Sequence, residues 1–297
     1  MEQRSLGRTQ MSVSVLGFGG SEIGYEQASV ATVTRLLGAA LGAGLNVIDT
    51  AECYERSEEL IGRALEARRR DCWLFTKCGH PGGWGRGDWR PVSLLASIQR
   101  SLQRLRTDHV DLVQLHSCSE TVLRRGDAIE ALQTARQRGL TRFIGYSGDG
   151  DAARYAVECG AFDTLQTSIS IADQEAIART VPLAQARGMG VIAKRPLANA
   201  AWLLSRRPSR GSYEYDYWER LQTLKYPFLA APDGVATALR FTLSVPGVHT
   251  AIVGTARPGR FEDNARALAP GPLAEAEFAA IRARWNEVAR TSWVGQV

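Results

Sequence analysis

The sequence predicts one α/β domain over residues 1–297, a (β/α)8 (TIM) barrel with an N-terminal β-hairpin and long loops after its third and seventh strands. Two observations predict this class. Eight short apolar runs have the length of buried parallel strands, and an amphipathic helical pattern follows each run. Right-handed crossovers place the helices outside the resulting sheet. The predicted strands are Val13–Phe18, Leu45–Ile48, Trp73–Thr76, Leu112–Leu115, Arg142–Tyr146, Thr164–Thr167, Gly190–Ala193 and Thr250–Val253.

Helix start and stop signals support the predicted helices. Ser57 opens one of them with Glu58 and Glu59 in its first turn, Pro91 suits the first turn of another, and glycines follow the ends of several. The predicted helices are Val30–Ala43, Ser57–Leu65, Pro91–Leu105, Ala128–Arg138, Asp151–Cys159, Gln174–Arg187, Val235–Leu243 and Pro258–Leu268.

Three segments lie outside this repeat. A hairpin over Arg4–Val15, turning at Gly7-Arg8, precedes the first strand and could close the bottom of the barrel. The loops Gly79–Arg90 and Arg195–Asp233 are longer than the connections of a barrel need to be. Because long loops in compact domains are usually functional or mobile, we expect both to border the site.

A doubly wound dinucleotide-binding fold is the main structural alternative. Its fingerprint, Gly-x-Gly-x-x-Gly, should follow the first strand. The chain has Gly17-Phe18-Gly19-Gly20-Ser21-Glu22 at this place, which lacks the third glycine. It also contains no phosphate-binding Gly-Lys-Ser/Thr loop. The barrel is therefore preferred.

The composition excludes several classes of protein. Hydrophobic residues make up 44% and charged residues 23%, which is typical of a globular chain and not of a disordered one. The net charge of +5 is spread along the chain, and its densest run, Arg68–Arg70, follows a predicted helix, so we expect no nucleic-acid partner. No apolar run is long enough to span a membrane, and no secretory signal is evident. Five scattered cysteines favour a reducing cytoplasm.

Polar residues stand where predicted strands end, the edge at which barrels of this class carry their active sites. Asp49, Lys77 and His116 end the second, third and fourth strands, and Tyr54 follows Asp49 in the next loop. Lys77 is one of only three lysines among 36 basic residues, which indicates a role that arginine could not fill. Each residue also has an ordinary structural explanation. Asp49 could cap a helix, and Lys77 could lie at a solvated strand end. His116 could be a satisfied buried histidine, and Tyr54 could pack at the rim. The occurrence of all four residues together favours a catalytic role.

The four residue types suit the reduction of a carbonyl group. A tyrosine is a poor acid at neutral pH, but a neighbouring ammonium stabilises the phenolate and lowers the pKa of the phenol. Asp49 would hold Lys77 in place and keep it charged. His116 could donate a hydrogen bond to the carbonyl oxygen, so that Tyr54 and His116 together stabilise the charge that develops there. A nicotinamide would supply the hydride.

These residues also carry a family resemblance. The segments Asp49–Tyr54, Ser57-Glu58, Phe75–Lys77 and Asp111–His116 resemble, in order and spacing, those of the aldo-keto reductase family, whose members are (β/α)8 barrels that use NADPH. The resemblance covers nearly the whole chain. It implies that Tyr54 is the general acid, that Lys77 and Asp49 tune it, and that His116 orients the substrate.

The resemblance implies a dinucleotide site as well. Ser147 and Gln166 resemble the residues that contact the nicotinamide carboxamide, although Gly148 stands where the family usually has asparagine. Lys194 replaces an aromatic residue that often stacks on the nicotinamide, while Pro196 and Leu197 keep the family register. We expect Lys194 or its neighbour, Arg195, to contact the pyrophosphate instead.

The last strand leads into the expected adenine end of this site. Gly254 and Thr255 occupy the place of a Lys-Ser pair that grips the 2′-phosphate in many members. Arg260 matches a position that stacks on adenine and reaches this phosphate, and Asp263 and Asn264 resemble a Glu-Asn pair near the adenine. A helix beginning at Pro258 would add its N-terminus. Arg260, Arg257 and Thr255 favour NADPH, with NADH possible.

Other functions remain open. A regulatory or binding protein could keep the barrel and the cofactor without physiological turnover, as channel-associated subunits of the family do. A Schiff-base lyase would need Lys77 neutral, whereas Asp49 would keep it charged. The substrate is a small-molecule carbonyl compound that the sequence does not name, with Trp84 and Trp89 as candidate pocket residues. The sequence does not fix the oligomeric state.

Three of the five cysteines flank the candidate catalytic positions. Cys53 precedes Tyr54, Cys78 follows Lys77, and Cys118 lies two residues after His116. They are either small apolar filler at strand ends or include a thiol exposed in the mouth of the active site. No Cys-x-x-Cys pair is present, so no metal site is expected.

Overall fold

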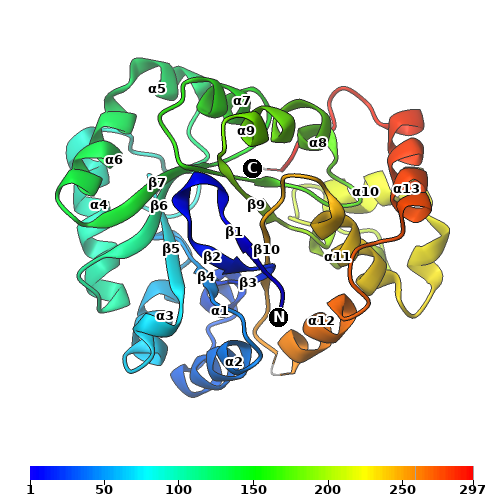
Figure 1. The fold of residues 1–297 in the computed structure, drawn as a ribbon, viewed down its shortest axis with the longest axis horizontal. Helices are drawn as coiled ribbons and strands as arrows, with labels where there is room; N and C mark the ends of the chain where they lie inside the picture. The colour runs from blue at the N-terminus through cyan, green and yellow to red at the C-terminus, as the bar shows by residue number, and fades with distance from the viewer. Residues whose placement is uncertain (258, 297) are drawn as a thin grey trace.

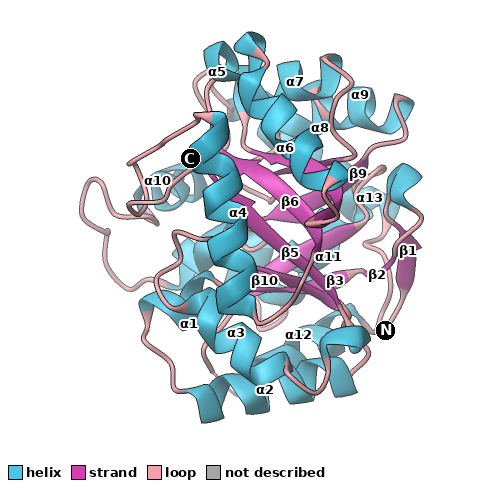
Figure 2. Cartoon of the chain, turned by 90° about the vertical axis from the view of Figure 1, so that its left-hand side faces the viewer, coloured by secondary structure: helices cyan, strands magenta, loops and turns pink. Residues whose placement is uncertain are grey.

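The structure is a computed structural model that describes residues 1–257 and 259–296. Eight parallel strands close into a barrel in the order β10-β3-β4-β5-β6-β7-β8-β9, with the helices outside it (Figures 1 and 2). The predicted fold class is confirmed. The strands are β3 Leu16–Gly19, β4 Val47–Asp49, β5 Trp73–Cys78, β6 Val110–His116, β7 Thr141–Ser147, β8 Thr164–Ser168, β9 Gly190–Lys194 and β10 Thr250–Gly254.

The hairpin closes the bottom of the barrel, as expected. Its strands β1 (Gln3–Ser5) and β2 (Ser12–Ser14) pair antiparallel and flank the short 3-10 helix η1 (Gly7–Thr9). In Figure 1 the blue hairpin lies across the near end of the barrel, and in Figure 2 it lies at the right-hand edge. Its apolar side chains are buried with barrel residues in one cluster: Leu6, Met11, Val13, Val47, Phe75, Leu112, Ile192 and Ile252.

The predicted first strand, Val13–Phe18, is wrong as a single element. Its first half belongs to β2 of the hairpin and its second half to β3 of the barrel. Hydrogen bonds of Ser14 mark the change of direction. Its backbone N–H donates to Asn46 Oδ1 at 2.7 Å, and its hydroxyl donates to the carbonyl oxygen of Leu16 at 2.7 Å. A continuous apolar pattern concealed this turn because both halves are buried.

Seven of the eight predicted helical segments recur with small shifts at their ends. The segment Gln174–Arg187 is two helices that meet at Thr180, because Pro182 lacks the N–H that a continuous helix would need. Pro258, the predicted start of the last segment, lies outside the described residues. The helices are α2 Val30–Gly42, α3 Ser57–Leu65, α4 Pro91–Leu105, α6 Asp127–Gln137, α7 Gly150–Glu158, α8 Glu175–Arg179, α9 Val181–Ala186, α11 Gly234–Ser244 and α12 Arg260–Leu268.

Further helices lie in segments that were read as loops or left without a prediction. The long loop after β9 contains α10 (Tyr215–Leu224), and α13 (Glu275–Val288) packs against it. Their buried side chains, which include Tyr217 and Trp285, form a second apolar cluster beside the barrel. The other additions are α1 Ser21–Tyr25, α5 Glu120–Arg125, η2 Arg69–Asp71, η3 Ala198–Leu203 and η4 Pro227–Ala230. Within the described residues, no helix has both the length and the apolar character to cross a bilayer.

The contact between the hairpin and the barrel gives a stability prediction. A Cβ on Gly190 would lie 2.6 Å from Leu6 Cγ and 3.1 Å from the Leu6 carbonyl oxygen. Gly190→Ala should therefore lower the free energy of unfolding by about 1–3 kcal/mol, the usual range for overpacking a core. Urea unfolding would measure this, with Gly42→Ala as control because no atom lies within 4 Å of its new methyl group. Equal stability of the two variants would contradict the prediction.

Candidate active site

A cavity of about 400 Å³ opens at the carboxyl ends of the barrel strands. This volume lies within the range of small-molecule and cofactor sites. Most of the residues that the sequence singles out line this cavity, although they come from strands far apart in the chain. They are Asp49, Tyr54, His116, Ser147, Gln166, Lys194, Arg195, Pro196, Leu197, Gly254, Thr255, Arg260 and Asn264.

A buried ion pair lies at the floor of the cavity. Lys77 Nζ donates to Asp49 Oδ2 and, at 2.9 Å, to the carbonyl oxygen of Thr50. The second carboxylate oxygen, Oδ1, accepts hydrogen bonds from Gln166 Nε2 at 2.9 Å and Gln114 Nε2 at 3.3 Å. Both charged side chains are 1% exposed. Asp49 and Lys77 are therefore fixed in position and charge by each other and by their neighbours.

Tyr54 lies in the turn after β4, above this pair. Lys77 Nζ is 5.0 Å from the centre of its ring, and the rings of Tyr54 and His116 meet edge to face with centroids 5.7 Å apart. Among the described residues, no hydrogen bond engages the Tyr54 hydroxyl. Burial, followed by the charge of Asp49, raises the pKa of Tyr54 well above its ordinary value. The lowered pKa expected from the sequence is thus not found, because burial disfavours the phenolate and the negative charge of Asp49 adds to this effect.

His116 ends β6 and faces Tyr54. Burial, and then the positive charge of Lys77, lower the pKa of its imidazole well below the ordinary value, so the ring is neutral. Its Nδ1 lies 3.5 Å from Cys53 Sγ. Its backbone carbonyl oxygen accepts a hydrogen bond from His80 Nε2 at 2.8 Å. The catalytic candidates therefore meet in one place, with the rings of Tyr54 and His116 against each other.

Ser147 and Gln166 extend the polar network along the cavity. Ser147 Oγ donates to Gln166 Oε1 at 2.9 Å, and the amide nitrogen of Gln166 donates to Asp49. The two residues are register partners on the adjacent strands β7 and β8. The structure therefore brings these two candidate cofactor residues side by side.

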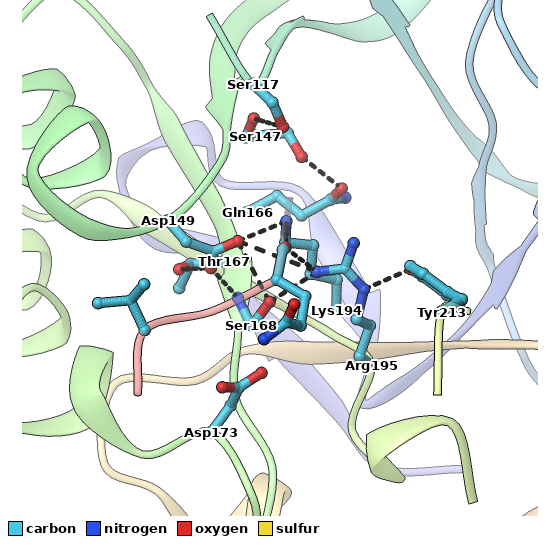
Figure 3. A network of polar contacts seen from close by, with 12 residues as sticks. Ser117, Ser147, Asp149, Gln166, Thr167, Ser168, Asp173, Lys194, Arg195 and Tyr213 are labelled. Carbon is cyan, nitrogen blue, oxygen red and sulfur yellow. Dashed lines mark hydrogen bonds and ion pairs between the residues drawn. The ribbon is translucent and has the colours of Figure 1, made fainter. Parts of the chain in front are cut away.

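A second buried ion pair lies on the β9 side of the cavity (Figure 3). Lys194 Nζ is 2.7 Å from Asp149 Oδ2, and Asp149 Oδ1 also accepts hydrogen bonds from Thr167 and from the Ser168 backbone N–H. Burial opposes ionisation of Asp149, yet the charges of Lys194 and Arg195 outweigh it and lower its pKa. Burial also lowers the pKa of Lys194 to about 8. The sequence did not indicate this role for Asp149.

The last described residues of the chain fold over this second pair. Arg195 donates to the backbone carbonyl oxygen of Gln296, and Lys194 Nζ lies 3.5 Å from the same oxygen. A Cβ on Gly295 would lie only 2.3 Å from Asp149 Cγ. The tail therefore packs closely against the wall where the sequence predicts pyrophosphate contacts.

The adenine end of the predicted site is only partly as expected. Arg260 opens α12, and Asn264 lies one turn further along the same wall. Asp263 does not line the cavity and instead pairs with Arg266 on the outer surface. Sequence reasoning missed Glu22, whose carboxylate lies so close to Gly254 that a Cβ there would be 1.6 Å from Oε2. Burial raises the pKa of Glu22.

The two tryptophans of the loop after β5 take different places. Trp84 is 45% exposed and packs edge to face against His116, with centroids 4.9 Å apart. Trp89 covers Gly79 and packs against His80 behind the site. Neither lines the cavity itself. Sequence reasoning missed His80, which Glu52 anchors by accepting its backbone N–H at 2.8 Å.

The chain was compared with known proteins. The sequence model of the Aldo/keto reductase family matches residues 15–286. The uncharacterized oxidoreductase YqkF of Bacillus subtilis is 28% identical, with 97% of each chain covered. A probable voltage-gated potassium channel subunit beta of Arabidopsis thaliana is 25% identical, covering 92% of this chain and 93% of that protein. The holo form of aldo-keto reductase AKR11C1 from Bacillus halodurans has a TM-score of 0.84 at 26% identity, with 99% of each chain covered.

The cysteines give a prediction that needs no knowledge of function. Cys53, Cys78 and Cys118 are at most 5% exposed, and burial raises the pKa of each thiol, so the filler explanation is favoured over a reactive thiol in the mouth of the site. Only Cys159 is partly exposed among the five. Iodoacetamide should therefore label Cys159 first in the native protein, as measured by peptide mass spectrometry. Denatured protein is the control, and rapid native labelling of the three buried thiols would contradict the prediction.

Proposed function

The chain belongs to the aldo/keto reductase family, and from this premise we propose that it reduces an aldehyde or ketone to an alcohol with a nicotinamide dinucleotide. The observation that carries the proposal is the convergence of Asp49, Tyr54 and His116 on one cavity, with Lys77 against both Asp49 and Tyr54. When bound, the nicotinamide supplies the hydride. The chain's own residues then have to orient the carbonyl group and provide a proton to its oxygen.

Tyr54 is the proposed general acid. Its raised pKa keeps the phenol protonated at neutral pH, which a proton donor requires. Its hydroxyl has no hydrogen-bond partner among the described residues, so it is available to a carbonyl oxygen. The Lys77 ammonium, 5.0 Å from the ring centre, stabilises the phenolate as the proton leaves. Neutral His116 faces the same space and orients the oxygen by hydrogen bonding.

The wall residues of the cavity fit a dinucleotide. The amide Nδ2 of Asn264 is buried without a hydrogen-bond partner among the described residues, which suits an acceptor atom of an adenine. Ser147 and Gln166 would hold the carboxamide at the other end. Between them, Arg195 would exchange the carbonyl oxygen of Gln296 for the pyrophosphate, while Asp149 keeps Lys194 in place. Arg260 would bind the 2′-phosphate of NADPH, whereas the carboxylate of Glu22, which also lines the cavity, would repel this phosphate and limit the preference for NADPH over NADH.

A regulatory protein without physiological turnover is the second candidate. The similarity to a probable potassium channel subunit beta favours it. The two candidates differ in one measurement, the oxidation of NADPH in the presence of a panel of aldehydes, ketones and quinones. Turnover of any member supports the reductase, and dinucleotide binding without turnover supports the regulatory protein. The proposed partner is a small-molecule carbonyl compound in the first case.

Removal of the Tyr54 hydroxyl tests the proposed acid. Tyr54→Phe should lower the turnover of a simple aldehyde by about 100-fold or more, because a positioned proton donor contributes that much to the rate. The affinity for the dinucleotide, measured by fluorescence quenching, should stay the same. Tyr155→Phe is the matched control, since Tyr155 lies on α7 and does not line the cavity. A Tyr54→Phe variant with nearly normal turnover would remove Tyr54 from this role.

Arg260 tests the cofactor preference. We expect a modest preference for NADPH, and Arg260→Ala should raise the KM for NADPH while leaving that for NADH nearly unchanged, because only NADPH carries the 2′-phosphate. Arg266→Ala is the control, since Arg266 pairs with Asp263 on the outside of the same helix. Equal effects on both cofactors would limit Arg260 to stacking on adenine, and a wild-type preference for NADH would overturn the assignment.

A further inference from the structure

Cys53 makes a contact that neither composition nor motif spacing explains. Its Sγ lies 3.5 Å from Nδ1 of His116, within the reach of a sulfur hydrogen bond. No other described residue forms a hydrogen bond with either ring nitrogen of His116. The hydrogen bond from His80 goes to the backbone carbonyl oxygen, and the two rings meet only edge to face, with centroids 5.6 Å apart. Among the described residues, Cys53 is therefore the only hydrogen-bond partner of Nδ1.

The direction of this hydrogen bond follows from the charge states. Burial raises the pKa of the Cys53 thiol to about 12, so the sulfur keeps its proton. Burial and the charges of Lys77, Lys194 and Arg195 keep His116 neutral. A neutral imidazole carries one N–H and one acceptor nitrogen. Because an imidazole nitrogen is a better acceptor than a thiol sulfur, the arrangement in which the thiol donates to Nδ1 is favoured, and it places the ring proton on Nε2.

We propose that Cys53 is a positioning residue whose thiol donates to Nδ1 of His116 and thereby holds the ring in the Nε2–H tautomer that presents a proton to the cavity. The consequence for catalysis rests on the proposed function, since it requires a carbonyl oxygen as the acceptor. The alternative tautomer would direct the lone pair of Nε2 at this oxygen and repel it. The role of Cys53 is thus to select between two neutral states of one side chain.

The surroundings of His116 leave this selection to Cys53. Burial, and then the positive charge of Lys77, lower the pKa of His116 and disfavour a protonated ring, so only the choice of tautomer remains. Trp84 and Tyr54 contact the ring with their aromatic edges and faces, which restrict its orientation but assign no proton. Cys53 itself is held by Tyr25, whose hydroxyl donates to its carbonyl oxygen at 3.4 Å.

NMR spectroscopy tests the tautomer without any turnover. In protein with 15N-labelled histidine, two-bond 1H–15N correlations distinguish the two neutral tautomers and the imidazolium, and His116→Asn identifies the relevant signals. The wild type and Cys53→Ser should show the Nε2–H form, because both side chains can donate to Nδ1. Cys53→Ala should show a mixture of tautomers, and Cys118→Ala is the control with another buried cysteine removed. An imidazolium or an Nδ1–H ring in the wild type, or an unmixed Nε2–H ring in Cys53→Ala, overturns the proposal.

Kinetics separate positioning from a merely structural effect. Cys53→Ala should lower kcat about 3- to 10-fold, the factor that corresponds to one ordinary net hydrogen bond, with the KM for the dinucleotide unchanged. Cys53→Ser should recover most of this loss. If Cys53→Ala lowers kcat and Cys53→Ser does not restore it, Cys53 does not act by donating a hydrogen bond to His116. A wild type that reduces no carbonyl compound overturns the proposed function, whereas the NMR result still decides the tautomer.

Discussion

The buried ion pair of Asp49 and Lys77 is the constraint on which the site depends. Two charges that are 1% exposed are stable only when their remaining hydrogen-bonding capacity is met. Gln114 and Gln166 donate to the carboxylate and Thr50 accepts from the ammonium, while Ser147 in turn fixes Gln166. These partners come from β6, β7 and β8 as well as from the segment after β4. Satisfying one ion pair thus fixes side chains on five strands of the barrel.

The scarcity of lysine acquires a physical meaning in the structure. Of the three lysines, Lys77 and Lys194 are the buried ones, and each is paired with an aspartate at a strand end. A compact ammonium has three donors, which an aspartate and one or two oxygens can satisfy in a narrow space. A guanidinium has five donors in a fixed plane. The chain uses arginine where more acceptors are available, as at Arg220, which donates to Asp173 and to the carbonyl oxygens of Ala172 and Val294.

The sequence predicted the parts of the molecule that depend on periodicity and on strand ends. Strands are short and buried, so their polar ends identified Asp49, Lys77 and His116. The errors arose where tertiary contacts decide. Asp263 resembles a cofactor residue, yet its position on α12 turns it toward Arg266. Asp149 follows β7 and pairs with Lys194 at the end of β9, and the order of β7, β8 and β9 side by side in the sheet brings them together.

Neutral and charged side chains around the cavity have separate places. The side chains of Tyr54 and His116 are neutral because burial disfavours their ionised forms. Arg195 and Lys194 line the same cavity, where Asp149 pairs with Lys194, and Lys77 pairs with the lining residue Asp49. Negative charge that develops inside is therefore stabilised by groups that already point toward it. Burying a cation costs desolvation free energy. The attraction of Lys77 to Asp49 and of Lys194 to Asp149 offsets part of this cost.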